Sequence, residues 1–542
     1  MIQIISAYFP IILLIFLMTK KNSLPSNKAL PITALVTYFI ALIIFRQNAN
    51  IVHATVLQGL LVAFTPILII ACAIFLFKTM EKTGGLAVIK VWLNGVSENK
   101  VAQLMIVGWA FPFLIEGASG FGTPAAIAAP ILVGLGFPPV RMAILVLIMN
   151  TVPVSFGAVG TPTWFGFSGI ELTAIEILQI GSKTSTLNGI AALFIPIAAL
   201  TFAVKLKSVL QNVPFILLSV ISTVVPYVIV AQYNYEFPSL VGGFIGIIAT
   251  VVLAKYKVGL SKKEVVMHEA VAKSELLNTD TDLHVEKPTL QKLLKASFPI
   301  WGTLLLLIIT RIPQLGVKSL LVYNHTNFAV ALGSLGTFTL SPALVISLKD
   351  IFQTNINWSH SILYVPSVLP FLAISLLSFL WNKSERKIIK STFGETFRQM
   401  VNPTYALLGT LVFVGLMMMG GNDSPVNLIG NNLAELTGGS WKYFASLLGA
   451  LGTFFSGSNT ISNLTFGAIQ DSIAGTIGLN RTTVLALQSA GGAMGNMICI
   501  NNIVAVASVL ALSNVEGYIL KRTVRVLVLY ALIVGIVALF LP

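Results

Sequence analysis

The fold class is decided by FPFLIEGASGFGTPAAIAAP, residues 111–130, and by a second stretch, LGTFFSGSNTISNLT, residues 451–465. Both are embedded in apolar sequence, yet both carry glycines and hydroxyl side chains, and the first also carries prolines. Interrupted backbone of this kind is tolerated inside a bilayer only where it is buried in protein or lines an aqueous cavity. The two stretches therefore predict broken helices or re-entrant hairpins. Close helix packing through small residues is the alternative for the glycines alone.

The composition outside these stretches is that of a membrane protein. Of 542 residues, 56% are hydrophobic and only 10% are charged, whereas a soluble domain has about 25% charged residues. A helix needs about 20 apolar residues to cross the bilayer, and the chain offers about 12 to 14 such stretches. We therefore predict an all-α polytopic membrane protein with that number of transmembrane helices.

The net charge of +14 arises from short Lys and Arg clusters between the apolar stretches. This distribution is the positive-inside pattern of membrane proteins, so no nucleic-acid partner is expected. The two cysteines, Cys72 and Cys499, both lie within apolar stretches. They indicate buried small side chains, with neither a disulfide framework nor a metal cluster.

A charged segment divides the chain almost at its centre. Residues 255–295 contain eight lysines and six acidic residues, which is typical of a solvated linker. The predicted organisation is a first membrane half (1–254), a cytoplasmic linker (255–296) and a second membrane half (297–542). An apolar stretch at 328–348 is predicted as a span, but the positive loops then disagree on sidedness between Arg311 and Lys383. Either one segment there is re-entrant, or one predicted helix is not a span.

The two halves share a spacing. Asn150 follows Ser119 by 31 positions, and Gln488 follows Ser456 by 32, and each of these later residues opens a second polar, glycine-rich stretch. Arg141 or Arg481 precedes each second stretch. Weak internal symmetry across a central linker is expected of transporter repeats, whose substrate lies between interrupted helices near the bilayer midplane.

The polar residues of these stretches suit a small organic anion. The N-termini of broken helices present free N–H groups and partial positive charge, which favour an anion. Arg141 and Arg481 are candidates to pair with a carboxylate, although each also stands where a cytoplasmic topology residue is expected. The uncharged candidates for substrate binding are Ser119, Gly120, Thr123, Asn150, Ser155, Thr161, Ser456, Ser458, Asn459, Thr460, Gln488 and Asn496.

Among the 19 acidic residues, Glu116 alone is both embedded in an apolar run and next to a broken-helix stretch. Burying a charged carboxylate in a membrane is costly, so such a residue is a functional candidate by default. We predict that Glu116 exchanges a coupled proton, with a structural role in the hairpin as the alternative. Asp471, just beyond the second stretch, is a second candidate for proton coupling, or else a solvated residue at a hairpin tip.

Enzymatic chemistry is not expected. The sequence has no Gly-x4-Gly-Lys-Ser/Thr loop for nucleotide phosphates. The segment from Gly117 to Gly122 is not a Gly-x-Ser-x-Gly elbow, because Phe121 occupies the closing position. We predict no cofactor and no metal.

Residues 115–130, with LGFPP at 135–139 and PVSFGAVGTP at 153–162, resemble the bacterial L-lactate permease family, which includes glycolate permeases. FSGSNTISN at 455–463 and QSAGGAMGNM at 488–497 resemble its second-half signatures, and the likeness extends from end to end. The resemblance implies a symporter of the bacterial inner membrane that imports L-lactate, and often D-lactate or glycolate, with protons. It further implies inverted repeats with one re-entrant hairpin each, elevator-like movement and a homodimer.

Three alternatives remain. Ser458-Asn459-Thr460 is similar to a hairpin motif of sodium-coupled dicarboxylate transporters, but the matching place in the first half contains Ser119-Gly120-Phe121, which weakens the case for Na⁺ as the coupling ion. A passive anion channel would equilibrate the same substrates without concentrating them. A proton-translocating subunit of a membrane oxidoreductase would need ionisable residues repeated along the midplane, and Lys and His are scarce there.

Overall fold

The computed structural model describes the backbone of residues 2–19, 24–120, 123–271, 288–311, 315–323, 328–365, 368–510, 512 and 515–541. The chain forms two compact units, each drawing on segments from both sides of the central charged segment. The first unit contains residues 1–84, 296–438 and 471–477, and the second contains 85–295, 439–470 and 478–542. These two units are not the two membrane halves predicted from the sequence. The halves were defined as sequence repeats, and they stay a prediction.

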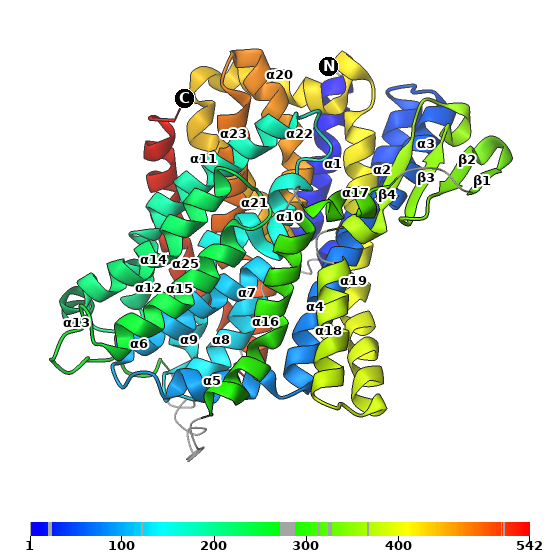
Figure 1. The fold of residues 1–542 in the computed structure, drawn as a ribbon. Helices are drawn as coiled ribbons and strands as arrows, with labels where there is room; N and C mark the ends of the chain where they lie inside the picture. Colours follow the sequence, from blue (N-terminus) through cyan, green and yellow to red (C-terminus); the bar gives the residue numbers. More distant parts are fainter. Residues whose placement is uncertain are drawn as a thin grey trace. The chain divides into compact units, whose positions relative to one another are not determined.

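In the first unit, α2 (Ser26–Ile43), α3 (Ala49–Val62) and α4 (Phe64–Lys82) pack against the long helix α19 (Arg386–Met418) (Figure 1). Glycines permit this close packing: a Cβ on Gly409 would lie 2.5 Å from the Pro31 nitrogen. The other helices of this unit are α1 (Ile2–Thr19), α16 (Leu290–Arg311), α17 (Val317–Leu321), α18 (Val368–Trp381) and α20 (Pro425–Thr437).

The first unit also contains a four-stranded antiparallel sheet in the order β1-β2-β3-β4, formed by β1 (Phe328–Ala331), β2 (Thr337–Leu340), β3 (Val345–Lys349) and β4 (Trp358–Ser361). The sheet lies beside α3 (Figure 1), and Leu348 and Ile351 pack on Ala54 of that helix. The predicted span at 328–348 is therefore wrong. Turns such as that at Gly336, whose φ is 106°, fold the apolar run back on itself, so it cannot form a helix. This also removes the disagreement over sidedness.

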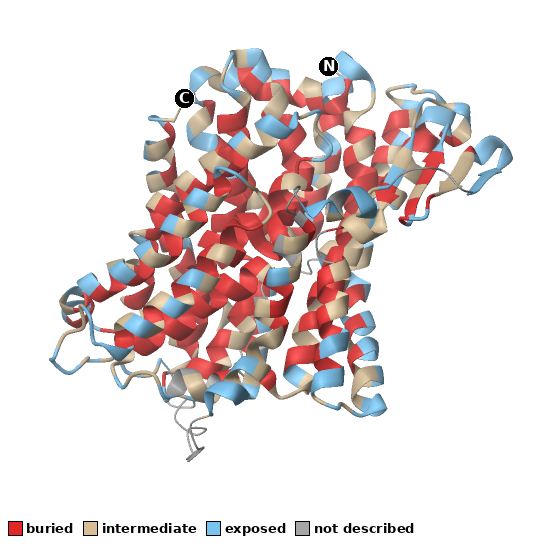
Figure 2. Cartoon of the chain, viewed as in Figure 1, coloured by how far each residue is buried: buried red, intermediate tan, exposed pale blue. Residues whose placement is uncertain are grey.

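The regular elements of the second unit are helices, apart from an isolated antiparallel bridge between Val204 and Met267, and most of the central helices are buried (Figure 2). Its first series is α5 (Gly85–Asn94), α6 (Lys100–Leu104), the π-helix η1 (Met105–Ala110), α7 (Phe111–Ser119), α8 (Thr123–Val133), α9 (Pro139–Met149), the 3₁₀-helix η2 (Val152–Phe156), α10 (Gly157–Trp164), α11 (Ala174–Ala192), α12 (Ile195–Leu200), α13 (Leu206–Gln211), α14 (Val213–Ala231) and α15 (Pro238–Lys255). Its second series is α21 (Trp441–Ser456), α22 (Asn459–Ile477), α23 (Arg481–Gly495), the 3₁₀-helix η10 (Asn496–Ile498), α24 (Ile500–Val509) and α25 (Glu516–Ala538), with the last turns of α22 assigned to the first unit.

In the described part of the chain, seven helices are long and apolar enough to cross a membrane, or eight if the bent pair of α9 with η2 and α10 is one span. Shorter apolar helices, such as residues 368–381, add to these. The predominantly helical, polytopic class is confirmed, with the small sheet as an addition to it. The inverted relation of the repeats stays a prediction.

Candidate functional site

The second unit encloses a small cavity where its broken helices meet. The cavity volume is about 20 Å³, which accommodates a water molecule but no organic anion. Its lining residues come from α7, from the bend between α9 and α10, from the start of α22 and from η10. They are Glu116, Gly120, Val154, Gly157, Ala158, Pro162, Gly457, Ser458, Asn459, Thr460 and Asn496.

Glu116 supplies the carboxylate of the cavity. Its helix, α7, ends at Gly120, which has a φ of 64° and whose N–H donates to the Glu116 carbonyl at 3.0 Å. The side chain is 2% exposed, and Oε2 accepts a 2.9 Å hydrogen bond from Nδ2 of Asn150. The second oxygen, Oε1, lies close to Gly157: a Cβ on that residue would be 2.7 Å from it. Glu116 is thus a buried acid that lies between the side-chain amide of Asn150 and the backbone at Gly157.

The bend opposite Glu116 is strained. Helix α9 ends at Asn150, η2 follows, and the span turns by 44° before α10. Ala158 and Val159 take φ values of 45° and 58°, in the left-handed region that L-residues, and β-branched ones above all, disfavour. Strain of this kind persists where the surroundings over-determine it, and it is typical of functional sites.

The second side of the cavity repeats the helix break with different chemistry. Helix α21 ends at Gly457, with a φ of 73°, and α22 starts two residues later. The Ser458 N–H donates to Oγ of Ser456 at 3.2 Å, which fixes the turn. The start of α22 thus contributes Ser458, Asn459 and Thr460 to the cavity lining, and Oγ of Ser458 accepts from the Ile461 N–H at 3.4 Å.

A fully buried network holds the two sides together. Nδ2 of Asn459 donates to the Ser489 carbonyl at 3.0 Å, and Oγ of Ser155 donates to the same carbonyl at 3.1 Å. Ser155 in turn accepts from Nδ2 of Asn188 at 3.0 Å, and Asn188 accepts from the Tyr530 hydroxyl at 3.1 Å. The η2 bend and the start of α22 are thereby tied to α11, α23 and α25.

Known proteins resemble this chain over its whole length. Residues 3–542 match the L-lactate permease family. The chain is 47% identical over 542 residues to a putative L-lactate permease of Haemophilus influenzae, covering 100% of this chain and 99% of that one.

The chain belongs to the L-lactate permease family.

Two further relatives are more distant. An L-lactate permease of Bacillus subtilis is 28% identical, covering 90% of this chain and 87% of its own. The glycolate permease GlcA of Escherichia coli is 25% identical, covering 94% and 90%. The predicted family and its end-to-end extent are confirmed. This permease is a multi-pass membrane protein, in keeping with the bacterial inner membrane.

The structure brings part of the predicted binding set into the cavity of the permease. Six predicted residues line it: Glu116, Gly120, Ser458, Asn459, Thr460 and Asn496. Asn150 and Ser155 contact lining residues through hydrogen bonds. The side chains of Ser119 and Thr123 lie outside the described residues.

The remaining uncharged candidates bond to the surrounding protein. Thr161 donates to the Ala158 carbonyl within the bend, and Ser456 caps the turn at Gly457. Gln488 bonds to Ser462 through Nε2 and accepts from Gln470 through Oε1. These contacts are structural ones, and the roles of the three residues toward a substrate stay predictions.

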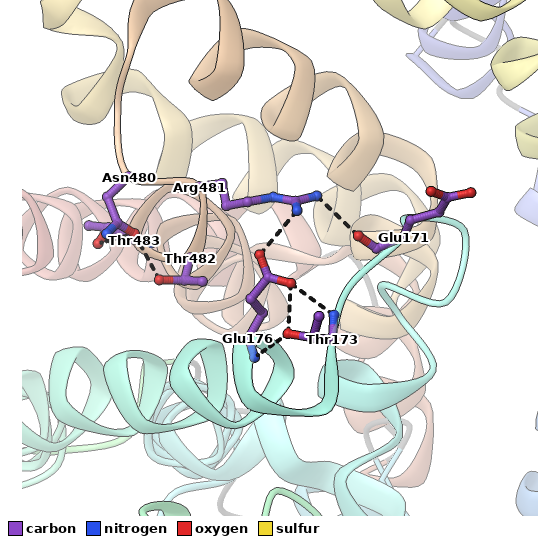
Figure 3. Close-up of polar contacts among 7 residues, drawn as sticks. All are labelled: Glu171, Thr173, Glu176, Asn480, Arg481, Thr482 and Thr483. Atoms are coloured by element: carbon purple, nitrogen blue, oxygen red, sulfur yellow. Dashed lines mark hydrogen bonds and ion pairs between the residues drawn. The ribbon is translucent and has the colours of Figure 1, made fainter.

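The two candidate arginines lie at other places. Arg141 donates to the backbone carbonyls of Phe202 and Glu269. Figure 3 shows Arg481 directed at Glu176, with its guanidinium 3.1 Å from Oε1, and also at the Glu171 carbonyl. Neither arginine lines the cavity.

Asp471 also does not line the cavity: it is one of the α22 residues that belong to the first unit. Among the described residues, no three His, Cys, Asp or Glu side chains gather into a metal site.

Sequence reasoning missed the support behind the cavity. This support consists of three fully buried residues, Asn188, Tyr227 and Tyr530. Nδ2 of Asn188 donates to the Tyr227 hydroxyl at 3.4 Å. Each is a polar side chain inside an apolar stretch of a membrane protein. That isolation is itself a functional signal, but it does not say which residue each one contacts.

Proposed function

We propose that this permease imports L-lactate and glycolate by symport with protons. The relatives named above are L-lactate and glycolate permeases, which supports a small 2-hydroxymonocarboxylate as the substrate. The observation that carries the proposal is that one buried cavity is lined by both a carboxylic acid, Glu116, and the N-terminus of α22.

The start of α22 is the substrate end of the cavity in this proposal. The first-turn amides of a helix lack intrahelical acceptors and carry partial positive charge, so they stabilise a carboxylate. Ser458 and Thr460 add hydroxyl groups that donate to the carboxylate or accept from the 2-hydroxyl group. A lactate anion binds there without a fixed positive charge.

Glu116 is the proton end. A charged Glu116 and a bound anion in the same small cavity repel each other at low dielectric. Protonation of Glu116 removes that repulsion, so proton binding and anion binding favour each other, and this reciprocity is thermodynamic coupling. Because the cavity has a volume of only about 20 Å³, binding also requires the α10 bend or the Gly457 turn to move outward.

The test is uptake of labelled lactate by purified permease in liposomes. An inward proton gradient without Na⁺ is expected to drive accumulation, and glycolate is expected to compete. The Glu116→Gln variant is expected to lose accumulation while retaining exchange of lactate across the membrane. Glu435→Gln is the matched acid-to-amide control, because that side chain is exposed in α20 and does not line the cavity, and it is expected to accumulate lactate normally.

The outcomes separate the alternatives. Accumulation that requires Na⁺ and ignores the pH gradient would assign sodium coupling. Equilibration without accumulation under either gradient would assign a passive carrier or channel. Accumulation by Glu116→Gln at the wild-type level would remove Glu116 from coupling. The proposal includes a homodimer and no cofactor, which light scattering and metal analysis of the same preparation check.

A further inference from the structure

Asn150 is the hydrogen-bond partner of Glu116, and only one end of its side-chain amide is hydrogen-bonded. Its Nδ2 donates to Oε2 of Glu116 at 2.9 Å. Its Oδ1 is buried and has no hydrogen-bond partner among the described residues. A buried polar atom without a partner costs free energy, so it calls for a physical reason.

Few charged groups in the described residues approach Glu116. Glu236, two residues before α15, packs its backbone on Gly160 of α10 and is an acidic residue beside the bend. The elements packed against α7 are η1, η2, α8, α10 and α15. Their described residues include one ionisable side chain, Lys255, at the last position of α15. Gly117 packs on Leu240 near the other end of that helix, so Lys255 lies about 15 residues, or roughly 22 Å, further along it. Asn150 is the described side chain that donates a hydrogen bond to the Glu116 carboxyl group.

The two protonation states of Glu116 need opposite partners. A carboxylate only accepts hydrogen bonds, whereas a carboxylic acid donates one through its O–H. An asparagine amide carries a donor and an acceptor on one planar group, and half a turn about its last torsion exchanges them. With Nδ2 toward Glu116 the charged form is satisfied, and with Oδ1 toward Glu116 the protonated form is satisfied.

We propose that Asn150 is the positioning residue for proton exchange: its amide rotates to donate to the Glu116 carboxylate and to accept from the Glu116 carboxylic acid. The unpartnered Oδ1 is the acceptor kept for the protonated state. Asn150 is also the C-cap residue of α9, two positions before η2, so the rotation takes place where the span is broken. This inference rests on the proposed function, in which Glu116 carries the coupled proton.

Asn150→Leu keeps the size of the side chain and removes both functions of the amide. Loss of the donor disfavours the Glu116 carboxylate, so the proton is held to higher pH. The midpoint of lactate uptake against pH is expected to move up by about one unit, the equivalent of one hydrogen bond to a charged group. Asn150→Asp, which is isosteric, is also expected to move it upward, because two adjacent carboxylates resist double ionisation. The Asn150→Asp variant provides the same test if Asn150→Leu fails to fold.

Two controls distinguish positioning from structure. Asn212 is a fully buried asparagine whose Nδ2 donates to the Ser208 carbonyl at 2.8 Å, far along the chain from Glu116. Asn212→Leu protein that folds is expected to keep the wild-type pH midpoint of lactate uptake. In the Glu116→Gln background, lactate exchange needs no proton, so adding Asn150→Leu is expected to change its rate less than twofold.

The inference is overturned if both Asn150 variants fold and keep the wild-type midpoint. It is also overturned if Asn150→Leu slows exchange equally in the wild-type and Glu116→Gln backgrounds, since that result assigns a structural role. Failure of the proposed function has a different signature, namely pH-driven accumulation by Glu116→Gln itself.

Discussion

The two broken-helix regions of the second unit share one order of elements and differ in chemistry. In the first, α7 ends at a glycine with positive φ, α8 and α9 follow, and the 3₁₀-helix η2 precedes α10. In the second, α21 ends at such a glycine, α22 and α23 follow, and η10 precedes α24. The first region contributes the cavity's one carboxylate, and the second contributes Ser458, Asn459, Thr460 and Asn496, which are uncharged.

The amides in the two regions differ in the same sense. Asn150 leaves an oxygen unpartnered beside Glu116. Gln488 uses both ends of its amide, with Nε2 donating to Oγ of Ser462 at 3.0 Å and Oε1 accepting from Gln470 at 2.9 Å. The amide of Asn150 therefore has an acceptor to spare, whereas the amide of Gln488 has none, although Oδ1 of Asn459 in the second region is also buried without a partner among the described residues. Substitution of Asn150 is expected to alter pH-dependent transport, and substitution of Gln488 to alter stability.

The largest expected effect is on the packing of the second region. A Cβ on Gly491 of α23 would lie 1.9 Å from the carbonyl oxygen of Ser446 in α21. Because that atom is backbone, Gly491→Ala forces the two helices apart, at an expected cost of about 1–3 kcal/mol or more. Thermal unfolding of the purified permease measures it. Gly535→Ala in α25, where a Cβ meets nothing within 4 Å, is the control and is expected to melt at or above the wild-type temperature.

The next effect separates function from stability in the first region. A Cβ on Gly157 meets the end of a flexible side chain, Oε1 of Glu116 at 2.7 Å, and Gly157 has an ordinary φ of −63°. Gly157→Ala is expected to displace the carboxylate, lowering proton-driven uptake by about 10- to 100-fold with little change in melting temperature. Wild-type uptake by this variant, or a melting loss as large as that of Gly491→Ala, would contradict the contrast between the regions.

The sequence predicted the chemistry of the site better than its support. Glycines, prolines and hydroxyls interrupting an apolar run are local signals, so the breaks and cavity residues such as Glu116 and Asn459 could be identified from them. The bond between Tyr530 and Asn188 joins residues 342 positions apart. Nothing in a local pattern specifies such a partner, because it depends on how buried helices pack.

The sheet shows a different limit. Residues 328–348 are apolar enough on average for a span, but hydropathy sums do not register turns. Gly333 and Gly336, both at positive φ, and Leu344 at a φ of 54° reverse the chain within that stretch. The residues that form these short turns can be recognised in the sequence. The strand pairing, such as that of Phe338 with Leu348, cannot be read from it. The inconsistent loop charges were the available sign that the helix was misassigned.

A smaller effect is expected at Gln488, whose amide is hydrogen-bonded at both ends. Gln488→Leu removes hydrogen bonds to Ser462 and Gln470, but Gln470 keeps its bond to the Ala445 carbonyl at 2.9 Å. We expect a loss of about 1 kcal/mol in the free energy of unfolding, with no shift in the pH midpoint of uptake. Chemical unfolding and pH-dependent uptake of the same preparation check both parts. A shifted midpoint would mean that the second region also responds to protonation.

The smallest expected effect lies at the ion pair of Glu176, which lies outside the candidate spans, with Arg481, the first residue of one. The Thr173 backbone amide and hydroxyl, followed by Arg481, hold the pKa of the Glu176 carboxyl below its usual range. A carboxyl with a lowered pKa in the folded protein contributes stability above its ordinary pKa of about 4.3. That contribution is lost as the pH falls through the lowered value.

Glu176→Gln is therefore expected to melt slightly below the wild type at neutral pH, and the difference is expected to vanish under acid conditions. The effect is small because both partners are part-exposed, with 35% and 24% of their side-chain areas accessible. Glu171→Gln is the matched control, since Glu171 offers Arg481 its backbone carbonyl and not its carboxylate. If Glu176→Gln instead altered the pH midpoint of uptake, this contact between α11 and α23 would belong to the proton-coupled machinery, and the assignment of proton coupling to the first region alone would fail.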